Sequence, residues 1–286
     1  MKKNIFEEMN QKELQTENGR IVYWVSSCCA NKRTLVLLHG LTADHTLFER
    51  QIRYFIGRYN ILCWDNPAHG SSRPYSDFSY SRAADQLRDI LEREQITEAV
   101  FIGQSMGGYI TQTFMKKYPQ MVTGFVGIDT CPFGEQYYSK SDKWWLHQVE
   151  WMSRCYPHKL LIKEMAKACS CTIEGQNNMR RSLSVYTKKE LCHLMGIGFA
   201  GFLEENCNLR ITCPVLILVG EHDQTGKVMQ YCRQWNKETA FPFYVIPDAA
   251  HNSNYDNSDE VNARIEAFLA NLEHGREGRV KQDDSI

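Results

Sequence analysis

A serine stands between two glycines at the point where an apolar run meets a helical pattern. The stretch 103–107 reads GQSMG; it directly follows the apolar residues 99–102, and a helical pattern continues from it to Lys117. A sharp strand-to-helix turn lifts a serine hydroxyl clear of a sheet, and glycines give room where strand and helix approach closely. The pattern therefore predicts that Ser105 is a catalytic nucleophile.

Two later residues supply the proton-transfer partners that such a serine needs. A serine hydroxyl is protonated near neutral pH, so a histidine must take its proton and an acid must orient that histidine. His251 and Asp223 follow the last two apolar runs of the chain. Asp129 follows an earlier run and is the rival acid, but the order serine, aspartate, histidine favours Asp223. Ser105, Asp223 and His251 are the predicted catalytic triad.

The elements that must position these residues alternate between apolar runs and helical stretches. The runs predict strands at Ile21–Ser26, Thr34–His39, Ile61–Asp65, Ala99–Gln104, Gly124–Asp129, Val215–Val219 and Phe243–Ile246. Continuous apolar runs are typical of strands that are covered on both faces. We predict an α/β fold with a mostly parallel, twisted sheet flanked by helices, its first strand at an antiparallel edge. A final amphipathic helix is predicted over 258–272.

A long interval without strand patterns separates Asp129 from Val215. It holds about 85 residues, far more than a crossover connection needs. We predict an inserted helical cap at 131–209 and a core formed by 1–130 and 210–286. An aromatic face in the cap either packs it onto the core or lines a substrate pocket. The candidate substrate-binding residues are His39, Phe133, Trp144, Trp145 and Trp151.

With these residues in this order, the chain resembles the α/β-hydrolase superfamily, in particular its capped carboxylesterases, lactonases and carbon–carbon bond hydrolases. The resemblance covers residues 20–272. His39 and Gly40 are similar to the superfamily's oxyanion-loop motif. The resemblance implies that the backbone N–H groups of Leu41 and Met106 stabilise a developing oxyanion.

A second stretch, 65–72 with the sequence DNPAHGSS, resembles the superfamily's turn after the next strand. Ala68 stands where a glycine is usual, a departure that concerns the backbone of the turn more than catalysis. We assign His39 and His69 to loop structure near the site. The cysteines are expected to be reduced and mostly buried. We predict no metal and no cofactor.

Three functions remain open. The first is hydrolysis of a small or medium carboxylic ester, thioester or lactone through an acyl-enzyme that His251-activated water releases. Similar triads also cleave carbon–carbon bonds or promote elimination, as in the lyase step of menaquinone synthesis. Substrates of that second class usually carry carboxylates, which Arg154, Arg180 or Arg181 could bind. The third is a non-enzymatic ligand-binding or signalling role, which predicts capture without multiple turnover.

Charge and hydropathy set the expected partners. The 286 residues include 33 Lys and Arg against 34 Asp and Glu, a formal net charge of -1, so no global field attracts nucleic acid or anionic lipid. Residues 1–19 are polar, and no run approaches the roughly 18 apolar residues of a membrane span. We expect a cytoplasmic protein that binds a small-molecule acyl substrate, with neither nucleic acid nor membrane as partner. The oligomeric state is left open.

Overall fold

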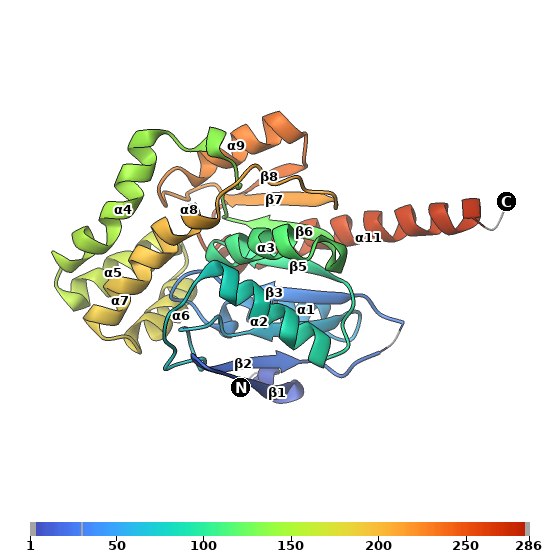
Figure 1. Cartoon of the computed structure of the whole chain (residues 1–286), viewed down its shortest axis with the longest axis horizontal. Coiled ribbons are helices and arrows are strands. Elements are labelled where there is room, and N and C mark those ends of the chain that lie inside the picture. Colours follow the sequence, from blue (N-terminus) through green and yellow to red (C-terminus); the bar gives the residue numbers. More distant parts are fainter. Residues whose placement is uncertain (1–3, 30, 284–286) are drawn as a thin grey trace.

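A central sheet of eight strands organises the molecule (Figure 1). The structure is a computed structural model that describes residues 4–29 and 31–283, with side chains described up to Glu273. The strands are β1 (Asn10–Thr16), β2 (Gly19–Val25), β3 (Thr34–Leu38), β4 (Asn60–Trp64), β5 (Ala99–Gln104), β6 (Val122–Ile128), β7 (Val215–Gly220) and β8 (Phe243–Ile246). Their order across the sheet is β1-β2-β4-β3-β5-β6-β7-β8. The β1–β2 and β2–β4 pairs are antiparallel, and all others are parallel.

The predicted α/β fold is confirmed, and the predicted strands differ from the observed ones by a few residues at their ends. The exception is β1, which the sequence did not indicate. Its residues NQKELQT alternate little between polar and apolar, and none of them is buried. β1 pairs along its whole length with β2 and takes the sheet's edge. The strand predicted at the edge, β2, is therefore second in order.

Two layers of helices cover the two faces of the sheet. The helices outside the β6–β7 interval are α1 (Glu49–Phe55), α2 (Tyr80–Arg93), α3 (Met106–Lys117), α9 (Val228–Thr239), α10 (Ser253–Asp256) and α11 (Ser258–Asp283), with short 3-10 turns at Ile5–Glu8, His45–Phe48 and Pro119–Met121. A further 3-10 turn, Glu135–Tyr137, lies within the interval. Helices α2, α3 and α9 share one apolar cluster with one face of the strands, and α1 and α11 share a second cluster with the other face. Because side chains alternate along a strand, β3 sends Val36 and Leu38 into the first cluster, and Leu35 and Leu37 into the second.

The final helix begins at Ser258, as predicted, and continues beyond the predicted end to Asp283. Val261, Ile265 and Phe268 pack into the second cluster, with Leu272 at its margin. Within the described residues, no helix combines the length and the apolar character needed to cross a bilayer.

Helices fill the interval between β6 and β7, which contains no strand. They are α4 (Lys140–Arg154), α5 (His158–Cys169), α6 (Ile173–Ser184), α7 (Lys188–Gly196), a π-turn (Ile197–Gly201) and α8 (Phe202–Glu205). We call residues 139–205 the helical segment. Capping boxes start α4 at Ser139 and α7 at Thr187. A third apolar cluster joins α5, α6 and α7 to Ala43 and Leu47 of the core. In Figure 1 the helical segment lies to the left of the sheet.

Candidate active site

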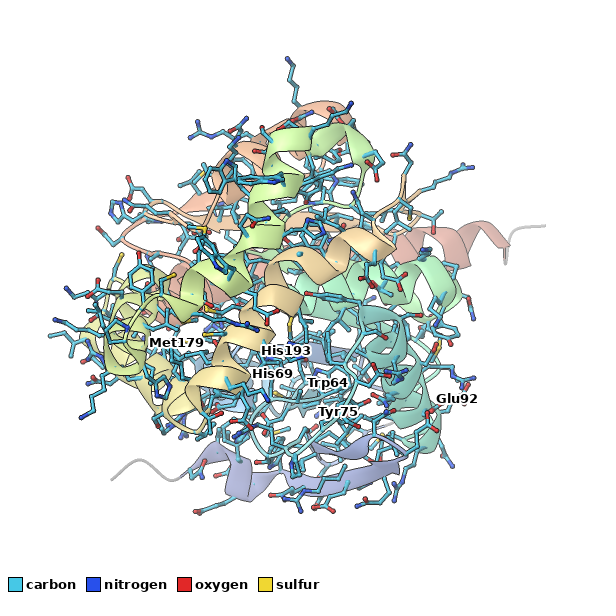
Figure 2. All side chains as sticks on the ribbon, turned by 60° about the vertical axis from the view of Figure 1, so that its left-hand side comes forward. Trp64, His69, Tyr75, Glu92, Met179 and His193 are labelled. Atoms are coloured by element: carbon cyan, nitrogen blue, oxygen red, sulfur yellow. The ribbon has the colours of Figure 1, made fainter. Side chains whose placement is uncertain are left out.

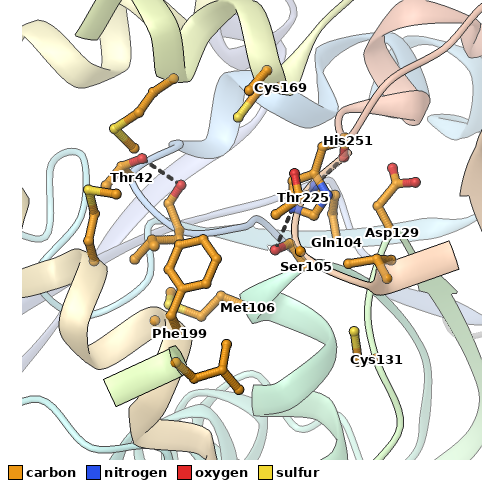
Figure 3. Close-up of a pocket in the computed structure, with 18 of the residues that line it drawn as sticks. Thr42, Gln104, Ser105, Met106, Asp129, Cys131, Cys169, Phe199, Thr225 and His251 are labelled. Atoms are coloured by element: carbon orange, nitrogen blue, oxygen red, sulfur yellow. Dashed lines mark hydrogen bonds between the residues drawn. The ribbon is translucent and has the colours of Figure 1, made fainter. Parts of the chain in front are cut away.

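Ser105 occupies a strained turn between β5 and α3 (Figure 3). Its backbone has φ 49° and ψ −117°, a conformation that non-glycine residues rarely adopt and that persists only when the surroundings enforce it. Here the backbone on either side of Ser105 packs closely against neighbouring backbone at two places, Gly103 and Gly107. A Cβ on Gly103 would lie 2.6 Å from the carbonyl oxygen of Gly107, and a Cβ on Gly107 would lie 1.9 Å from the carbonyl oxygen of Leu38. The glycines thus let α3 pack directly on the sheet.

We expect Gly107→Ala to destabilise the fold by about 2–3 kcal/mol, because the added methyl group overlaps rigid backbone of β3. Urea unfolding followed by circular dichroism measures the change. Gly201→Ala is the matched control, since a Cβ there meets its nearest neighbours at 3.5 Å, an ordinary contact. Equal stability of the two variants would contradict the close packing of α3 on β3.

The structure brings the three predicted triad residues into one hydrogen-bonded chain. His251 Nε2 lies 2.8 Å from Ser105 Oγ, and His251 Nδ1 lies 2.9 Å from Asp223 Oδ2. A carboxylate only accepts, so Nδ1–H donates to Asp223 and Nε2 is left to accept the serine proton. Burial acts to lower the pKa of His251, but the charge and hydrogen bond of Asp223 outweigh it, and the pKa is raised above its ordinary value.

Asp129, the rival acid, forms hydrogen bonds with the end of β7 and the start of α10 rather than with His251. Its carboxylate accepts hydrogen bonds from the backbone N–H of Gly220 at 2.7 Å and from the N–H and hydroxyl of Ser253 at 2.9 and 2.7 Å. Burial, followed by the nearby charge of Asp223, raises the pKa of Asp129 to about 8. Asp223, whose Oδ2 lies 2.9 Å from His251 Nδ1, is therefore the stronger candidate for the acid of the triad.

Two further side chains fix the loop that carries His251, and the sequence did not single out either role. Gln104 donates its side-chain N–H to the carbonyl oxygen of His251 at 2.7 Å. The carboxylate of Asp256 accepts from the N–H of Ala250 at 3.0 Å, and also from the N–H groups of Cys171 and Thr172 at 2.8 and 3.1 Å. Asp256 thus ties the histidine loop to the turn between α5 and α6. No local sequence pattern marks such a contact.

The two predicted oxyanion donors belong to segments that meet at Ser105. Met106 is the first residue of α3, so its N–H has no acceptor within the helix. Leu41 lies in the loop after β3, where a Cβ on Gly40 would stand 3.1 Å from the Cβ of Ser105. Both Leu41 and Met106 line the cavity described below. Figure 3 shows Thr42 and Met106 on one side of Ser105 and His251 on the other.

His39 acts within the loop and does not line the cavity. Its side chain is fully buried, and its Nε2 accepts the N–H of Asn66 at 2.9 Å. Its Nδ1 lies 2.8 Å from the carbonyl oxygen of Gly40. Burial is the largest influence on the pKa of His39 and lowers it, which keeps the imidazole neutral. His39 therefore shapes the loop that carries Leu41.

The stretch 65–72 forms a buried turn beside this loop. Asp65 accepts the backbone N–H groups of His45 and Ser71 at 2.7 and 2.6 Å. Ala68 has φ 68°, so this chain places alanine in the left-handed conformation for which glycine is favoured. None of residues 65–72, all of which the structure describes, lines the cavity described below.

A cavity of about 640 Å³ opens above Ser105 and His251. Side chains from the core and the helical segment line it together, among them Leu41, Tyr109, Leu146, Leu161, Met165 and Phe202. Among the described residues that line the cavity, Lys227 is the one Lys or Arg, and its ammonium group pairs with Asp142 at 2.6 Å. The cavity is thus mainly apolar.

The predicted substrate-binding residues lie outside this lining, which corrects that prediction. Trp144, Trp145 and Trp151 are 57%, 56% and 65% exposed, because α4 turns Leu146 toward the cavity instead. Phe133 is buried behind the cavity wall. Its ring stacks on the rings of Tyr109 and Phe202, which line the cavity, with 6.2 Å between ring centroids in each pair. When a helix carries apolar residues on adjoining stripes, tertiary packing decides which stripe faces inward. The sequence pattern alone does not give that choice.

The arginines considered for carboxylate binding also lie outside the lining. Arg154 forms an ion pair with Glu150 of its own helix. Arg180 donates to Asn177 and Gln176, and Arg181 donates to Thr46. Among the described residues, one group has metal-ligand spacing: Glu221, His222 and Asp248 are all exposed and lie outside the cavity lining. Exposed groups of this kind are common without an ion.

Comparison with known proteins agrees with this architecture. A family profile described as alpha/beta hydrolase fold matches residues 33–157. The chain is 29% identical over 261 residues to 3-oxoadipate enol-lactonase 2 from Acinetobacter baylyi, covering 84% of this chain and 90% of the relative. The structure superposes on an esterase from Thermogutta terrifontis with a TM-score of 0.72 at 20% identity, over 92% of this chain and 99% of the other. It superposes on MenH from S. aureus with a TM-score of 0.73 at 18% identity, over 90% and 100%. The chain therefore has the fold of the α/β hydrolases and is similar in sequence to members of that superfamily.

Proposed function

We propose that the protein is a serine hydrolase that cleaves a small or medium carboxylic ester, thioester or lactone through an acyl-enzyme. Ser105 attacks the carbonyl carbon while His251 takes the hydroxyl proton, and Asp223 orients the imidazole and stabilises its cation. The backbone N–H groups of Leu41 and Met106 receive the oxyanion. His251 then protonates the leaving group and activates the water that releases the acid.

The observation that carries this proposal is the hydrogen-bonded chain at the floor of the cavity. With 2.8 Å between His251 Nε2 and Ser105 Oγ, the proton can move directly from nucleophile to base. The strained backbone of Ser105 holds the hydroxyl at the cavity surface, where an acyl group would bind. The helical segment supplies the opposite wall of the cavity, and we propose that it acts as the substrate-binding cap.

The lining favours a neutral, apolar acyl group over an anionic one. An enzyme that cleaves a carbon–carbon bond in a dicarbonyl acid, or that catalyses an elimination from such an acid, needs a cation to bind the substrate carboxylate. The guanidinium group of an arginine suits this because it binds a carboxylate through two hydrogen bonds. No arginine is found among the lining residues that the structure describes, and Lys227 is already paired with Asp142. The relative named as an enol-lactonase and the esterase with the same fold are consistent with acyl transfer to water.

Product release from p-nitrophenyl esters over time tests the proposed function. We expect multiple turnovers with acetyl, butyryl and hexanoyl esters, with an initial burst wherever deacylation is slower than acylation. One equivalent of product without turnover would favour a ligand-binding role. No reaction with esters, thioesters or lactones would overturn the proposal and favour the lyase or carbon–carbon hydrolase alternative.

Substrate charge gives a sharper comparison. We expect p-nitrophenyl butyrate to be cleaved with kcat/KM at least about tenfold higher than the p-nitrophenyl half-ester of succinate, because the carboxylate loses hydration in an apolar cavity without gaining a cation. The two substrates share a leaving group and a similar chain length. Equal values, or a preference for the half-ester, would show that a carboxylate is recognised and would contradict the proposed acyl specificity.

A further inference from the structure

The outer side of α4, the turn after it and the first turn of α5 carry apolar side chains that the described residues leave more than a third exposed. Trp144, Trp145 and Trp151 are each more than half exposed, and Met152, Tyr156 and Leu160 are 39%, 48% and 41% exposed. We call these six residues the tryptophan face. Trp144 and Trp151 are seven residues apart and so share one stripe of the helix. Exposed apolar side chains gathered on a short stretch of chain, with the ring centroids of Trp144 and Trp145 4.7 Å apart, are typical of a site of contact with a protein or a membrane.

The charge around the tryptophan face differs in sign from that of the whole chain. Residues 139–169 contain six Lys and Arg against three Asp and Glu, a formal net charge of +3, whereas the whole chain carries -1. Lys140 lies four residues before Trp144 on the same stripe, and Lys159, Lys163 and Lys167 recur at four-residue spacing along α5. These four lysines are exposed and have no ion-pair partner among the described residues.

The tryptophan face continues into the mouth of the cavity. Tyr156 belongs to the face and also lines the cavity, and Leu161 and Glu164 line it from the helix that begins just after Tyr156. Figure 2 views the molecule from the side of the helical segment and shows α4, in yellow-green, on the outer surface. An apolar substrate held in a lipid phase at this face would thus be next to the cavity entrance.

We propose that the tryptophan face docks on the surface of an anionic lipid bilayer, with the indole rings at the level of the lipid headgroups and the lysines of α4 and α5 against the lipid charges. Tryptophan is the side chain most suited to this interface, since it combines a large apolar ring with a polar N–H group. An interfacial helix typically presents tryptophan and leucine to the lipid with lysine beside them.

A second copy of the chain fits the face less well. A twofold-symmetric interface places the same patch on both subunits, so it would bring together two surfaces of net charge +3. The expectation that the protein has no membrane partner rested on the net charge of the whole chain and on the lack of a spanning segment. Neither feature describes a local surface, and the proposed contact replaces that expectation.

Vesicle flotation of the full chain tests the docking. The protein carries Ser105→Ala so that no lipid is hydrolysed, which makes the outcome independent of the proposed function. We expect it to float with vesicles of phosphatidylglycerol and phosphatidylcholine, less so with pure phosphatidylcholine or at high salt, and with a blue shift of tryptophan emission. Adding Trp144→Ala and Trp151→Ala should lower the partition coefficient about tenfold or more, and Lys159→Glu with Lys163→Glu should lower it likewise.

Matched controls keep the test specific. Arg233→Glu with Lys237→Glu makes the same charge change on the exposed side of α9, and Val185→Ala removes an exposed apolar side chain at the residue that follows α6. These controls should float like the parent. Equal flotation of the tryptophan variant and the parent, or no binding to any vesicle, would overturn the proposal. So would a dimer in sedimentation that the tryptophan variant abolishes, which would assign the face to a second copy of the chain.

Discussion

Ser105→Ala is expected to lower kcat/KM for p-nitrophenyl butyrate by at least about 10⁴-fold, because among the described residues Ser105 supplies the hydroxyl that is hydrogen-bonded to Nε2 of His251. The residual rate would come from substrate binding and oxyanion stabilisation alone. The melting temperature should stay within about 2 °C of the parent, since the serine hydroxyl serves the reaction and not the packing of the core. Steady-state kinetics and a thermal scan measure the two quantities.

The control for this variant is Ser184→Ala, whose hydroxyl lies at the exposed end of α6 and bonds a carbonyl of its own helix. It should keep the parent activity. If Ser105→Ala retained full hydrolysis while Ser184→Ala behaved in the same way, the nucleophile would have to be sought elsewhere and the acyl-enzyme mechanism abandoned.

Asp223→Asn is expected to lower kcat about 10⁴-fold, because an amide holds the imidazole in the wrong tautomer and offers no charge to its cation. The pH profile gives a second readout. The base must be neutral to act, so kcat/KM of the parent should rise with pH through a midpoint above about 6.5, the ordinary pKa of histidine. In Asp223→Asn the midpoint should move down, because burial lowers the pKa of His251 once the charge of Asp223 is gone.

Asp129→Asn is the matched comparison, since it makes the same change at the rival carboxylate. It should cost about 1–3 kcal/mol of stability, because an amide nitrogen would face a backbone donor of Gly220 or Ser253. Its turnover and pH midpoint should change much less than those of Asp223→Asn. Loss of turnover in a stably folded Asp129→Asn, with Asp223→Asn still active, would transfer the acid role to Asp129.

The sequence predicted those parts of the molecule that follow from local pattern. Buried parallel strands are continuous apolar runs, so β3 to β7 were predicted to within a few residues. The residues proposed for catalysis follow strand ends, and parallel strands deliver their carboxyl ends to one edge of the sheet. That is why Ser105, Asp223 and His251, far apart in the chain, could be predicted to meet.

What the sequence did not predict depends on contacts between distant segments. The aromatic stripes of α4 gave no indication of which one faces the cavity, and packing against α7 and the π-turn turned the tryptophans outward. The role of Gln104 rests on a hydrogen bond to His251 across 147 residues of sequence, and that of Asp256 rests on a hydrogen bond to Cys171 across 85 residues. In the sequence, nothing distinguishes polar residues such as Gln104 and Asp256 from those of the protein surface.

The polar strand β1 also bears on how the sheet avoids other chains. The edge of any sheet offers unpaired N–H and C=O groups on which a foreign strand can grow, and charged side chains on the outermost strand discourage such addition. β1 carries Lys12 and Glu13 where β2 would otherwise present Tyr23 and Val22 as the last row. The polar composition that prevented the prediction of β1 is thus suited to discouraging the pairing of this edge with strands of other chains. An apolar strand at the same place would favour aggregation.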